Sequence, residues 1–590
     1  MLMSILNSIS YKRAVIFTFC FIALFGVLLS FQGFDVCDEG LALTVYQQVF
    51  NCPSCIEFNF YRWFAAVSGG LWYLIFPDGG IWSFRVLTVL SFLVSAYFVF
   101  KLFKGYIKPY QIAIGVILSA FISDFGYLVF YHNHLTILLY VLIVFCLHRG
   151  ILNKRFLNLF FAGFLTVFCI LSRLPNITLL ALCITFFYPY FSEKDTKEKK
   201  QLVFNFFKYY ILGITAGILC FLLIAFLLNH QNSLLNSLYS TIGHGTASDG
   251  NHNVWALLMK YFESYLIVLI SGIKYILIAL VCLVSKSVVK NKYLNVAINV
   301  IFLLVFLRFF KGQDIFELYF FIFLGNALLL INRNSSLSLK LLSVMALIVA
   351  LVLPLGSDGA LHNMGYVSVW LAIPLAIASL SDTDLSFLKK LSFKDYKIKI
   401  NKSSVSMLFF ITLVAYASLK IYKISNEAYF DYGSRLEKTY SINAPLANNI
   451  YTTERRSIII NDLLENMSDY VKPDDYLLAY DKIPMIHFLS QTKPYMNTPW
   501  VWVYSGQMFE EKLKKAEKEI DILPIVVQQK FETIVAFSEP LDNYMSENGV
   551  ENNLHSNTRS KAMNNFLSRN NYKEVWSNDY FIIYEPNNKR

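Results

Sequence analysis

Long apolar segments separated by short polar stretches run through the first 421 residues of the chain. Residues 63–76 are apolar but short and interrupted by glycine, which predicts a helix lying in the membrane interface. The stretch 254–263 is expected to lie in the interface in the same way. The remaining apolar segments are long enough to span a membrane, and we count thirteen, near residues 14–31, 81–103, 110–130, 134–149, 156–173, 176–191, 207–229, 264–285, 294–311, 315–331, 340–355, 365–380 and 404–421.

The charges of the connecting loops alternate along the chain. One set of loops is basic and carries Lys101, Lys104, Lys108, Arg149, Lys154, Arg155, Lys194, Lys197, Lys199, Lys200, Lys208, Lys286, Lys290, Lys292, Arg333, Lys340 and the loop 389–402. The other set carries Asp35, Asp38, Glu39, Asp78, His132, His134, His244, Asp249, His252, Asp314, Asp358 and His362. Because basic loops stay in the cytoplasm, we expect a cytoplasmic N-terminus and, with an odd number of spans, an extracytoplasmic tail.

Composition agrees with this membrane class. Hydrophobic residues make up 56% of the 590 residues and charged residues only 15%, which indicates a polytopic membrane protein. The net charge of +11 does not indicate nucleic acid as a partner, because the basic residues lie between spans and form no tract interleaved with aromatic residues. We expect residues 14–31 to remain as a span, since no small-residue cleavage site follows them cleanly.

The tail is richer in Asn, Lys, Glu and Asp than the rest of the chain. It predicts a small extracytoplasmic α/β domain over residues 422–590, next to a transmembrane domain over residues 1–421. Helices are expected at about 455–468 and 507–520. Strands are expected at 476–480, 525–528, 533–537 and 580–584. No nucleophilic triad, phosphate loop or metal-spaced Cys/His set occurs in the tail, so it indicates no chemistry by itself.

The first outer loop reads FDVCDEGLALTVY over residues 34–46 and carries three carboxylates, Asp35, Asp38 and Glu39. Acids crowded at a membrane surface repel one another, so they need a cation, a basic partner or a shared proton. The alternative is a solvated loop in which an acid starts the helix near Leu41. Both interpretations stay open on the residues of this loop.

Three cysteines, Cys37, Cys52 and Cys55, share the same outer loop. One disulfide among them is expected in an oxidising compartment, which leaves one thiol over. A zinc site is less favoured, because three cysteines without a fixed histidine give an incomplete ligand set. The other six cysteines lie in predicted spans and are expected to be small apolar residues.

The Asp-Glu pair of the first outer loop is followed by the interfacial segment and by an arginine that opens the next span (Trp82-Ser83-Phe84-Arg85). Together with about thirteen spans and an extracytoplasmic C-terminal domain, this pattern resembles the GT-C superfamily of polyprenyl-phosphate-dependent glycosyltransferases. It is similar to the branch of protein O-mannosyltransferases, the lipid A aminoarabinose transferase and bacterial capsule-cluster proteins. The resemblance implies a catalytic acid at Asp38 or Glu39, with Asp35 as a neighbour.

The chain departs from this family in two places. Many relatives have a second acid near the start of the fourth span, where this chain has Tyr131-His132-Asn133-His134. Either Asp124 supplies that acid or His132 and His134 replace it, so the need for a divalent metal such as Mg or Mn stays open. The Trp-Trp-Asp-Tyr-Gly signature of oligosaccharyltransferases is also missing, since no Asp follows the tryptophans of Pro499-Trp500-Val501-Trp502. Transfer of a preassembled glycan onto Asn is therefore disfavoured.

Basic residues at the outer ends of spans are candidates for the donor phosphate. A cation there would stabilise the charge that develops on a leaving phosphate, while the alternative for each residue is snorkelling to the interface. The candidates are Arg85, Arg173, Arg308 and Lys311. The candidates for binding substrate hydroxyls are His132, His134, Asp358 and His362, and the polar loop 230–253 either orders over substrate or is a connector.

The expected function is transfer of a sugar from a polyprenyl-phosphate donor to an acceptor hydroxyl, with inversion, on the extracytoplasmic face of a bacterial inner membrane. The expected partners are the lipid-linked sugar, a glycan, lipid or protein acceptor, and membrane lipid. Three alternatives remain. A transporter or flippase would place charges in mid-membrane, a polymerase or ligase would have a large loop between late spans, and a scaffold would leave the outer acids unexplained.

Overall fold

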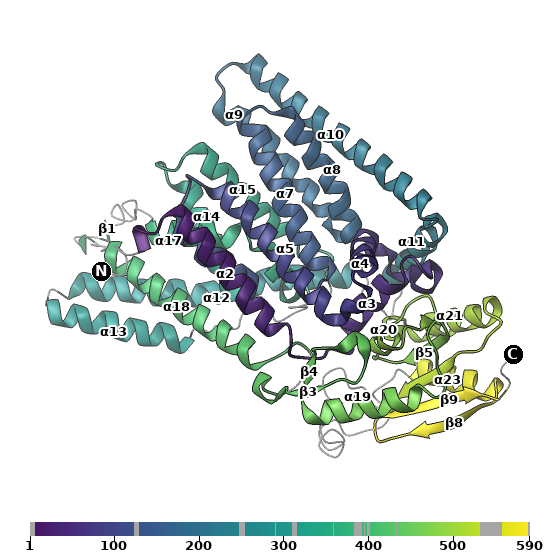
Figure 1. Cartoon of the computed structure of the whole chain (residues 1–590). Helices are drawn as coiled ribbons and strands as arrows, with labels where there is room; N and C mark the ends of the chain where they lie inside the picture. Colours follow the sequence, from purple (N-terminus) through teal and green to yellow (C-terminus); the bar gives the residue numbers. More distant parts are fainter. Residues whose placement is uncertain are drawn as a thin grey trace.

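The computed structural model contains a large helical body and a smaller domain with a sheet at its C-terminal end (Figure 1). It describes residues 6–122, 129–246, 254–289, 291–309, 315–357, 359–382, 392–393, 396–397, 402–431, 433–530 and 557–587. Strands 533–537, Asp124, Lys311 and Asp358, which the sequence singles out, lie outside these residues.

Every predicted span overlaps a helix, although α6 ends at Phe121, before the predicted end of its span at residue 130. These helices are α2 (Tyr11–Leu29), α5 (Gly80–Phe103), α6 (Pro109–Phe121), α7 (His132–Leu152), α8 (Phe156–Ser172), η3 (Leu174–Phe187), α10 (Thr196–Leu227), α12 (Val254–Val288), α13 (Lys292–Phe309), α14 (Ile315–Ile331), α15 (Leu337–Val352), the bent series η4 (Leu361–Gly365), α16 (Tyr366–Ser368) and α17 (Ala372–Asp382), and α18 (Lys402–Asn426). By length and composition, 6 helices among the described residues could cross a membrane. The number is 7 if the bent pair Leu361–Ser368 and Ala372–Ser381 forms one span. The structure therefore supports a membrane protein, while the count of thirteen spans stays a prediction.

Two shorter apolar segments have different outcomes. Residues 63–76 form a separate helix, α4 (Trp63–Ile75), as the glycine-broken pattern predicts. The prediction of a separate interfacial helix at 254–263 is wrong, because these residues are the first turns of the 35-residue helix α12. No glycine or proline interrupts the apolar positions there, so the helix continues.

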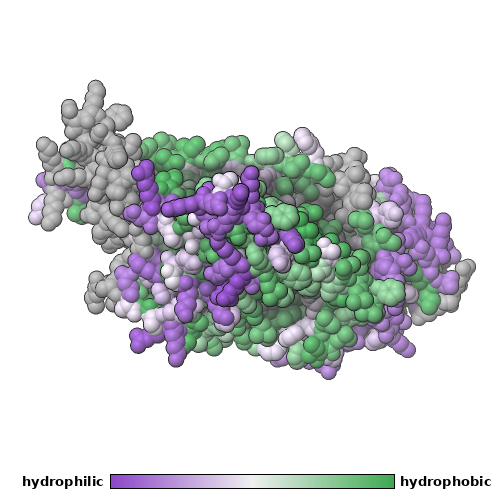
Figure 2. Space-filling model, turned by 90° about the horizontal axis from the view of Figure 1, so that it is seen from above, coloured by the Kyte–Doolittle hydropathy of each residue, from purple (hydrophilic) through white to green (hydrophobic). Residues whose placement is uncertain are grey.

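Small residues allow helices of the body to pack closely. A Cβ atom on Gly163 of α8 would lie 2.1 Å from the carbonyl oxygen of Tyr210, and one on Gly213 of α10 would lie 1.9 Å from that of Phe160. Only glycine permits this approach of two backbones. The opposite side of α10 exposes large apolar residues such as Leu223 and Phe226. The end of the molecule that is uppermost in Figure 1 gathers hydrophilic residues, with apolar surface around them (Figure 2).

The C-terminal domain follows α18 and contains a five-stranded sheet in the order β6-β5-β7-β9-β8. Its strands are β5 (Tyr476–Tyr480), β6 (Lys493–Pro494), β7 (Ile525–Gln529), β8 (Tyr572–Ser577) and β9 (Phe581–Pro586). β5 pairs in parallel with β6 and β7, and β9 pairs antiparallel with β7 and β8. The helices are α19 (Glu454–Met467), α20 (Met485–Ser490), α21 (Gly506–Glu519) and α23 (Asn557–Arg569). The predicted α/β character is therefore present, and the predicted strand at 476–480 coincides with β5.

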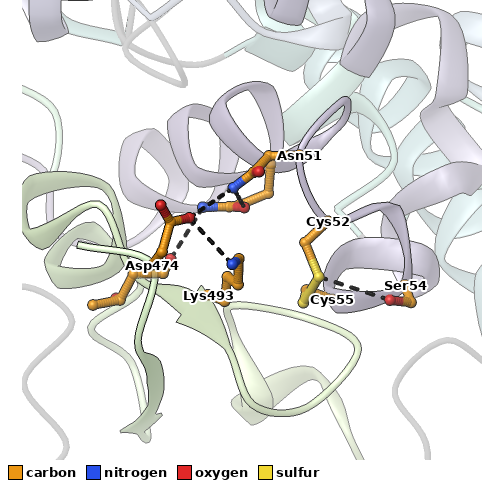
Figure 3. The surroundings of a disulfide bond; sticks show 8 residues. Asn51, Cys52, Ser54, Cys55, Asp474 and Lys493 are labelled. Carbon is orange, nitrogen blue, oxygen red and sulfur yellow. Dashed lines mark hydrogen bonds and ion pairs between the residues drawn. A yellow bond between two sulfur atoms is a disulfide. The ribbon is translucent and has the colours of Figure 1, made fainter. Parts of the chain in front are cut away.

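The sequence predicts one disulfide and one leftover thiol in the first outer loop, and the structure contains both. Cys52 and Cys55 form the disulfide at the start of η1 (Pro53–Arg62). Beside it, Asn51 donates a 3.0 Å hydrogen bond to Asp474, which also pairs with Lys493 at 3.2 Å (Figure 3). This end of the loop is thereby attached to the C-terminal domain.

Candidate functional site

The three acids of the first outer loop have three different environments. Asp35 lies just before helix α3 (Asp38–Gln48) and accepts 2.8 Å hydrogen bonds from the backbone N–H groups of Cys37 and Glu39. These are unpaired donors of the first helical turn, so Asp35 caps the helix. Burial raises the pKa of Asp35 well above its usual value, and the nearby carboxylate of Asp38 adds to the shift. The capping role considered for this loop is thus filled by Asp35.

Glu39 is buried and forms a two-point ion pair with Arg85 of α5. Arg85 Nε donates to Glu39 Oε1 at 2.9 Å, and Nη2 donates to Oε2 at 2.8 Å. The other hydrogen bonds of the guanidinium run to backbone carbonyl oxygens just after α2, namely those of Ser30 (2.9 Å), Gln32 (3.4 Å) and Gly33 (2.8 Å). Arginine has five N–H donors, and all of them are used here. In this structure Arg85 therefore has no N–H left for a phosphate.

Asp38 is the only one of the three acids that is partly exposed. It is the first residue of α3, and its Oδ2 accepts a 2.6 Å hydrogen bond from the hydroxyl of Tyr429, a residue that follows α18. Burial raises the pKa of Tyr429 well above its usual value, and the charge of Asp38 contributes to the same shift. The tyrosine therefore remains a donor and orients the carboxylate.

The C-terminal domain supplies the hydrogen bonds that fix the backbone of this loop. The N–H of Phe34 donates to Asp431 at 2.8 Å, and its carbonyl accepts from Arg456 at 2.7 Å. Asp431 is itself held by Lys438 at 3.2 Å and Arg456 at 3.4 Å, with all three side chains fully buried. An ion network of this kind fixes a backbone only when its members are all in place.

Helix α20 of the same domain packs directly on α3. The N–H of Met485 donates to the carbonyl of Val36 at 3.1 Å. The thiol of Cys37 donates to the carbonyl of Lys482 at 3.1 Å. A Cβ on Gly40 would lie 2.3 Å from the backbone nitrogen of Met485, so only glycine allows this approach. The position of Asp38 therefore depends on the C-terminal domain.

A second buried arginine lies against Tyr131. Arg62, the last residue of η1, is 3% exposed and donates to Asn59 at 3.2 Å. Its guanidinium lies over the ring of Tyr131, 5.1 Å from the centroid. Burial raises the pKa of Tyr131, while the charge of Arg62 opposes and that of Asp38 adds to this shift. Tyr131 thus lies within electrostatic reach of both the acid and the arginine, and no carboxylate of the described residues forms an ion pair with Arg62.

The start of α7 adds polar groups next to this arginine. The ring of His132 lies against that of Tyr131, tilted by 42° with ring centroids 4.1 Å apart, and its Nδ1 is buried without a hydrogen-bond partner among the described residues. Arg62 and Arg173 both lie close enough to act electrostatically on His132. His134 instead accepts a 3.1 Å hydrogen bond from the backbone N–H of Tyr131 and caps the helix. The structure thus brings Arg173 and His132 to the site and gives His134 a structural contact.

Arg173 is buried and donates to Asn176 at 3.2 Å. The two other described candidates, Arg308 and His362, are not joined to this group. Arg308 is an exposed residue in the last turn of α13. His362 packs edge-on against Phe316 with ring centroids 4.8 Å apart. Among the contacts of the described residues, none joins Arg308 or His362 to Asp38.

Sequence reasoning missed Arg62 and Tyr429. Arg62 directly precedes the apolar segment 63–76, where a basic residue is ordinarily an interface anchor. The aromatic residues on either side of it, Tyr61 and Trp63, are the only feature of the sequence that could have drawn attention to Arg62. Tyr429 follows the last span by few residues, and nothing in its sequence context indicates a contact with residue 38.

The described residues offer no metal site. No group of three or more His, Cys, Asp or Glu side chains lies together within the described part of the chain. Asp35 is occupied by two backbone donors and Glu39 by Arg85, so the first-loop acids do not fit a shared cation. We therefore derive no chemical step through a metal.

Comparison with known proteins gives little. No protein-family model and no curated protein sequence matches this chain. Among solved structures, the crystal structure of an oligosaccharyltransferase from Archaeoglobus fulgidus, tethered with an acceptor peptide, is similar over 87% of this chain and 69% of that chain, with 10% sequence identity and a TM-score of 0.41. A likeness this distant carries no argument about function.

Proposed function

We propose that the protein is a membrane glycosyltransferase that moves a sugar from a polyprenyl-phosphate donor to an acceptor hydroxyl. The observation that carries the proposal is the division of roles among the first-loop acids. Asp35 caps α3 and Glu39 holds Arg85, while Asp38 is partly exposed and oriented by Tyr429. A loop that served only as a helix start would need one cap and would not need a second, oriented carboxylate at its surface.

In the proposed reaction Asp38 is the general base. The acceptor hydroxyl gives its proton to the Asp38 carboxylate while its oxygen forms a bond to C1 of the donor sugar. The bond between C1 and the phosphate oxygen breaks on the opposite face, and its electron pair leaves with the polyprenyl phosphate. The sugar is transferred with inversion at C1. The hydrogen bond from Tyr429 fixes the rotamer of the carboxylate, which is the positioning that such a step requires.

The phosphate charge is assigned to Arg62, with Arg173 as a second cation. Arg62 is buried, has no carboxylate ion pair among the described residues and shares Tyr131 with Asp38 as a neighbour. A buried cation of this kind would stabilise a phosphate dianion in a low-dielectric site. Arg85, which the sequence proposed for this contact, is assigned a positioning role through Glu39.

The test is a turnover measurement with purified full-length protein. Membrane extracts of lipid-linked sugars and a panel of acceptors would be supplied, and release of polyprenyl phosphate would be followed. We expect release that depends on acceptor and that is lost in Asp38→Asn. Movement of intact donor across vesicles without release would support a flippase and would contradict the proposal.

A further inference from the structure

The end of the molecule remote from Asp38 contains a cavity. It has a volume of about 680 Å³ and lies between the start of α2, the α5–α6 turn, the α14–α15 turn and α17. The first outer loop follows the C-terminal end of α2, whereas Tyr11 at its N-terminal end lines the cavity. With 19 residues at 1.5 Å each, α2 separates the two places by about 28 Å. The cavity is therefore distinct from the candidate transferase site.

The walls of this cavity are amphipathic. Apolar groups come from Ile107, Leu329, Leu339 and Ala378, and polar groups come from Gln111, Asn332 and Ser335, among others. Two lysines, Lys104 and Lys108, stand on the two sides of the α5–α6 turn and also line it. The lining contains no carboxylate among the described residues. The cavity thus combines positive charge with apolar surface.

The environment of Lys104 keeps its charge available. Its ammonium lies over the ring of Tyr11, 5.1 Å from the centroid, and it forms no ion pair with a carboxylate of the described residues. Lys104 is exposed and ends α5, so the ammonium is at the edge of the apolar helices. The phosphate of a membrane lipid could approach this ammonium from the membrane surface, while the chains of the lipid stay among apolar side chains.

We propose that this cavity binds an anionic membrane lipid through its phosphate headgroup. The lysines attract the phosphate, and the apolar wall accommodates the first part of the acyl or prenyl chains. The volume is within the range of small-molecule sites in proteins. The lysines belong to loops predicted to be cytoplasmic, so the lipid would come from the leaflet opposite the reaction. This inference does not rest on the proposed transferase activity.

The test is a lipid titration of the full-length protein in neutral detergent, with bound lipid counted by native mass spectrometry. The probes are phosphatidylglycerol, phosphatidylcholine, a polyprenyl phosphate and inorganic phosphate. We expect phosphatidylglycerol to bind and the double variant Lys104→Gln/Lys108→Gln to weaken binding by about tenfold or more. The matched control is Lys101→Gln, which removes one exposed charge from the same helix end, outside the cavity lining.

The outcomes are distinguishable. Tighter binding of polyprenyl phosphate than of phosphatidylglycerol, with the same dependence on the lysines, supports the site and identifies its lipid. Equal binding of phosphatidylcholine, equal competition by inorganic phosphate, or an unchanged double variant overturns the proposal. Because Lys108 begins α6 and its loss can disturb the helix start, Lys104→Gln alone serves as the second variant, with an expected loss of about fivefold. Thermal unfolding of each variant confirms that it is folded.

Discussion

The hydroxyl of Tyr429 donates a 2.6 Å hydrogen bond to the carboxylate of Asp38 across a sequence separation of 391 residues. This contact joins the segment after the last helix of the body to the first residue of α3. In the proposed reaction Asp38 would take the proton of the acceptor hydroxyl, and Tyr429 would hold the Asp38 carboxylate in place.

We expect Asp38→Asn to lower turnover by ~10²–10⁴ while donor binding and thermal stability stay close to those of the natural chain. The amide keeps the size and hydrogen-bonding capacity of the side chain but cannot accept a proton. Tyr429→Phe should lower kcat by about tenfold with little change in donor KM, because it removes orientation only. Full activity of Asp38→Asn would remove the chemical basis of the proposed function.

Glu39→Gln should act mainly on stability. It leaves the guanidinium of Arg85 buried without its carboxylate, and breaking a buried pair costs about 3–5 kcal/mol. The same loss of unfolding free energy is expected for Arg85→Gln. The double variant should lose less than the sum of the losses of the two single variants. Unfolding by denaturant measures all three. If Glu39→Gln is stable but inactive, the base is Glu39 and the roles of the two acids are exchanged.

Arg62→Gln should weaken use of the donor. A charge-assisted contact to phosphate is worth about 1.5–3 kcal/mol, which corresponds to roughly tenfold or more in kcat/KM for the donor. Arg62→Lys should restore part of the loss, since it keeps the charge without the planar donor set. The control is Arg333→Gln, which removes an exposed arginine from the other end of the body. Unchanged donor kinetics in folded Arg62→Gln protein would assign Arg62 to packing against Tyr131.

Gly40→Ala should separate the C-terminal domain from α3. The new methyl group would overlap backbone atoms of Met485, so overpacking should cost about 1–3 kcal/mol and lower activity. Because the overlap is with backbone, Met485→Ala in the same chain should not rescue it. Limited proteolysis of the C-terminal domain reports the separation directly. Normal stability and activity of Gly40→Ala would contradict the close approach.

Lys482 should make stability depend on pH. Burial lowers its pKa to about 8, against the opposing charge of Asp481. The folded protein then loses this proton at a lower pH than the unfolded chain, whose lysine titrates near 10.4. Folding stability should therefore rise between about pH 8 and pH 10, by about 1 kcal/mol per pH unit at most. Lys482→Met should lack this rise when the unfolding temperatures of both proteins are compared at pH 7.5 and pH 9.5. Parallel pH profiles would contradict the shift.

Apolar length was enough to locate the helices of the body, since every predicted span overlaps one. The same pattern could not show where α12 begins. An apolar stretch before a span has the same sequence pattern whether it forms a separate interfacial helix or is the first part of the spanning helix. The strand at 476–480 was predictable because it is an apolar run buried on both faces. β6 is only two residues long and depends on its pairing with β5.

The site was predictable where its residues are close in sequence. The crowding of Asp35, Asp38 and Glu39 is visible in the chain, but their separate roles are not. Those roles depend on Arg85, on backbone donors and on Tyr429, which reach the loop only through the fold. The sequence offered Arg85 for the phosphate because it opens a predicted span, and only the structure shows that its guanidinium is saturated by hydrogen bonds.

The hydrogen bonds between the acidic loop and the C-terminal domain also set an order of events during synthesis. Residues 33–37 leave the ribosome early, but their hydrogen-bond partners are Tyr451, Asp431, Arg456, Met485 and Lys482. Until those residues have been made and have reached the loop, it lacks the hydrogen bonds that fix its shape. For the transferase proposed above, this means that a nascent chain with all its membrane helices in place is still inert, because Asp38 is positioned only after the last part of the protein has been synthesised.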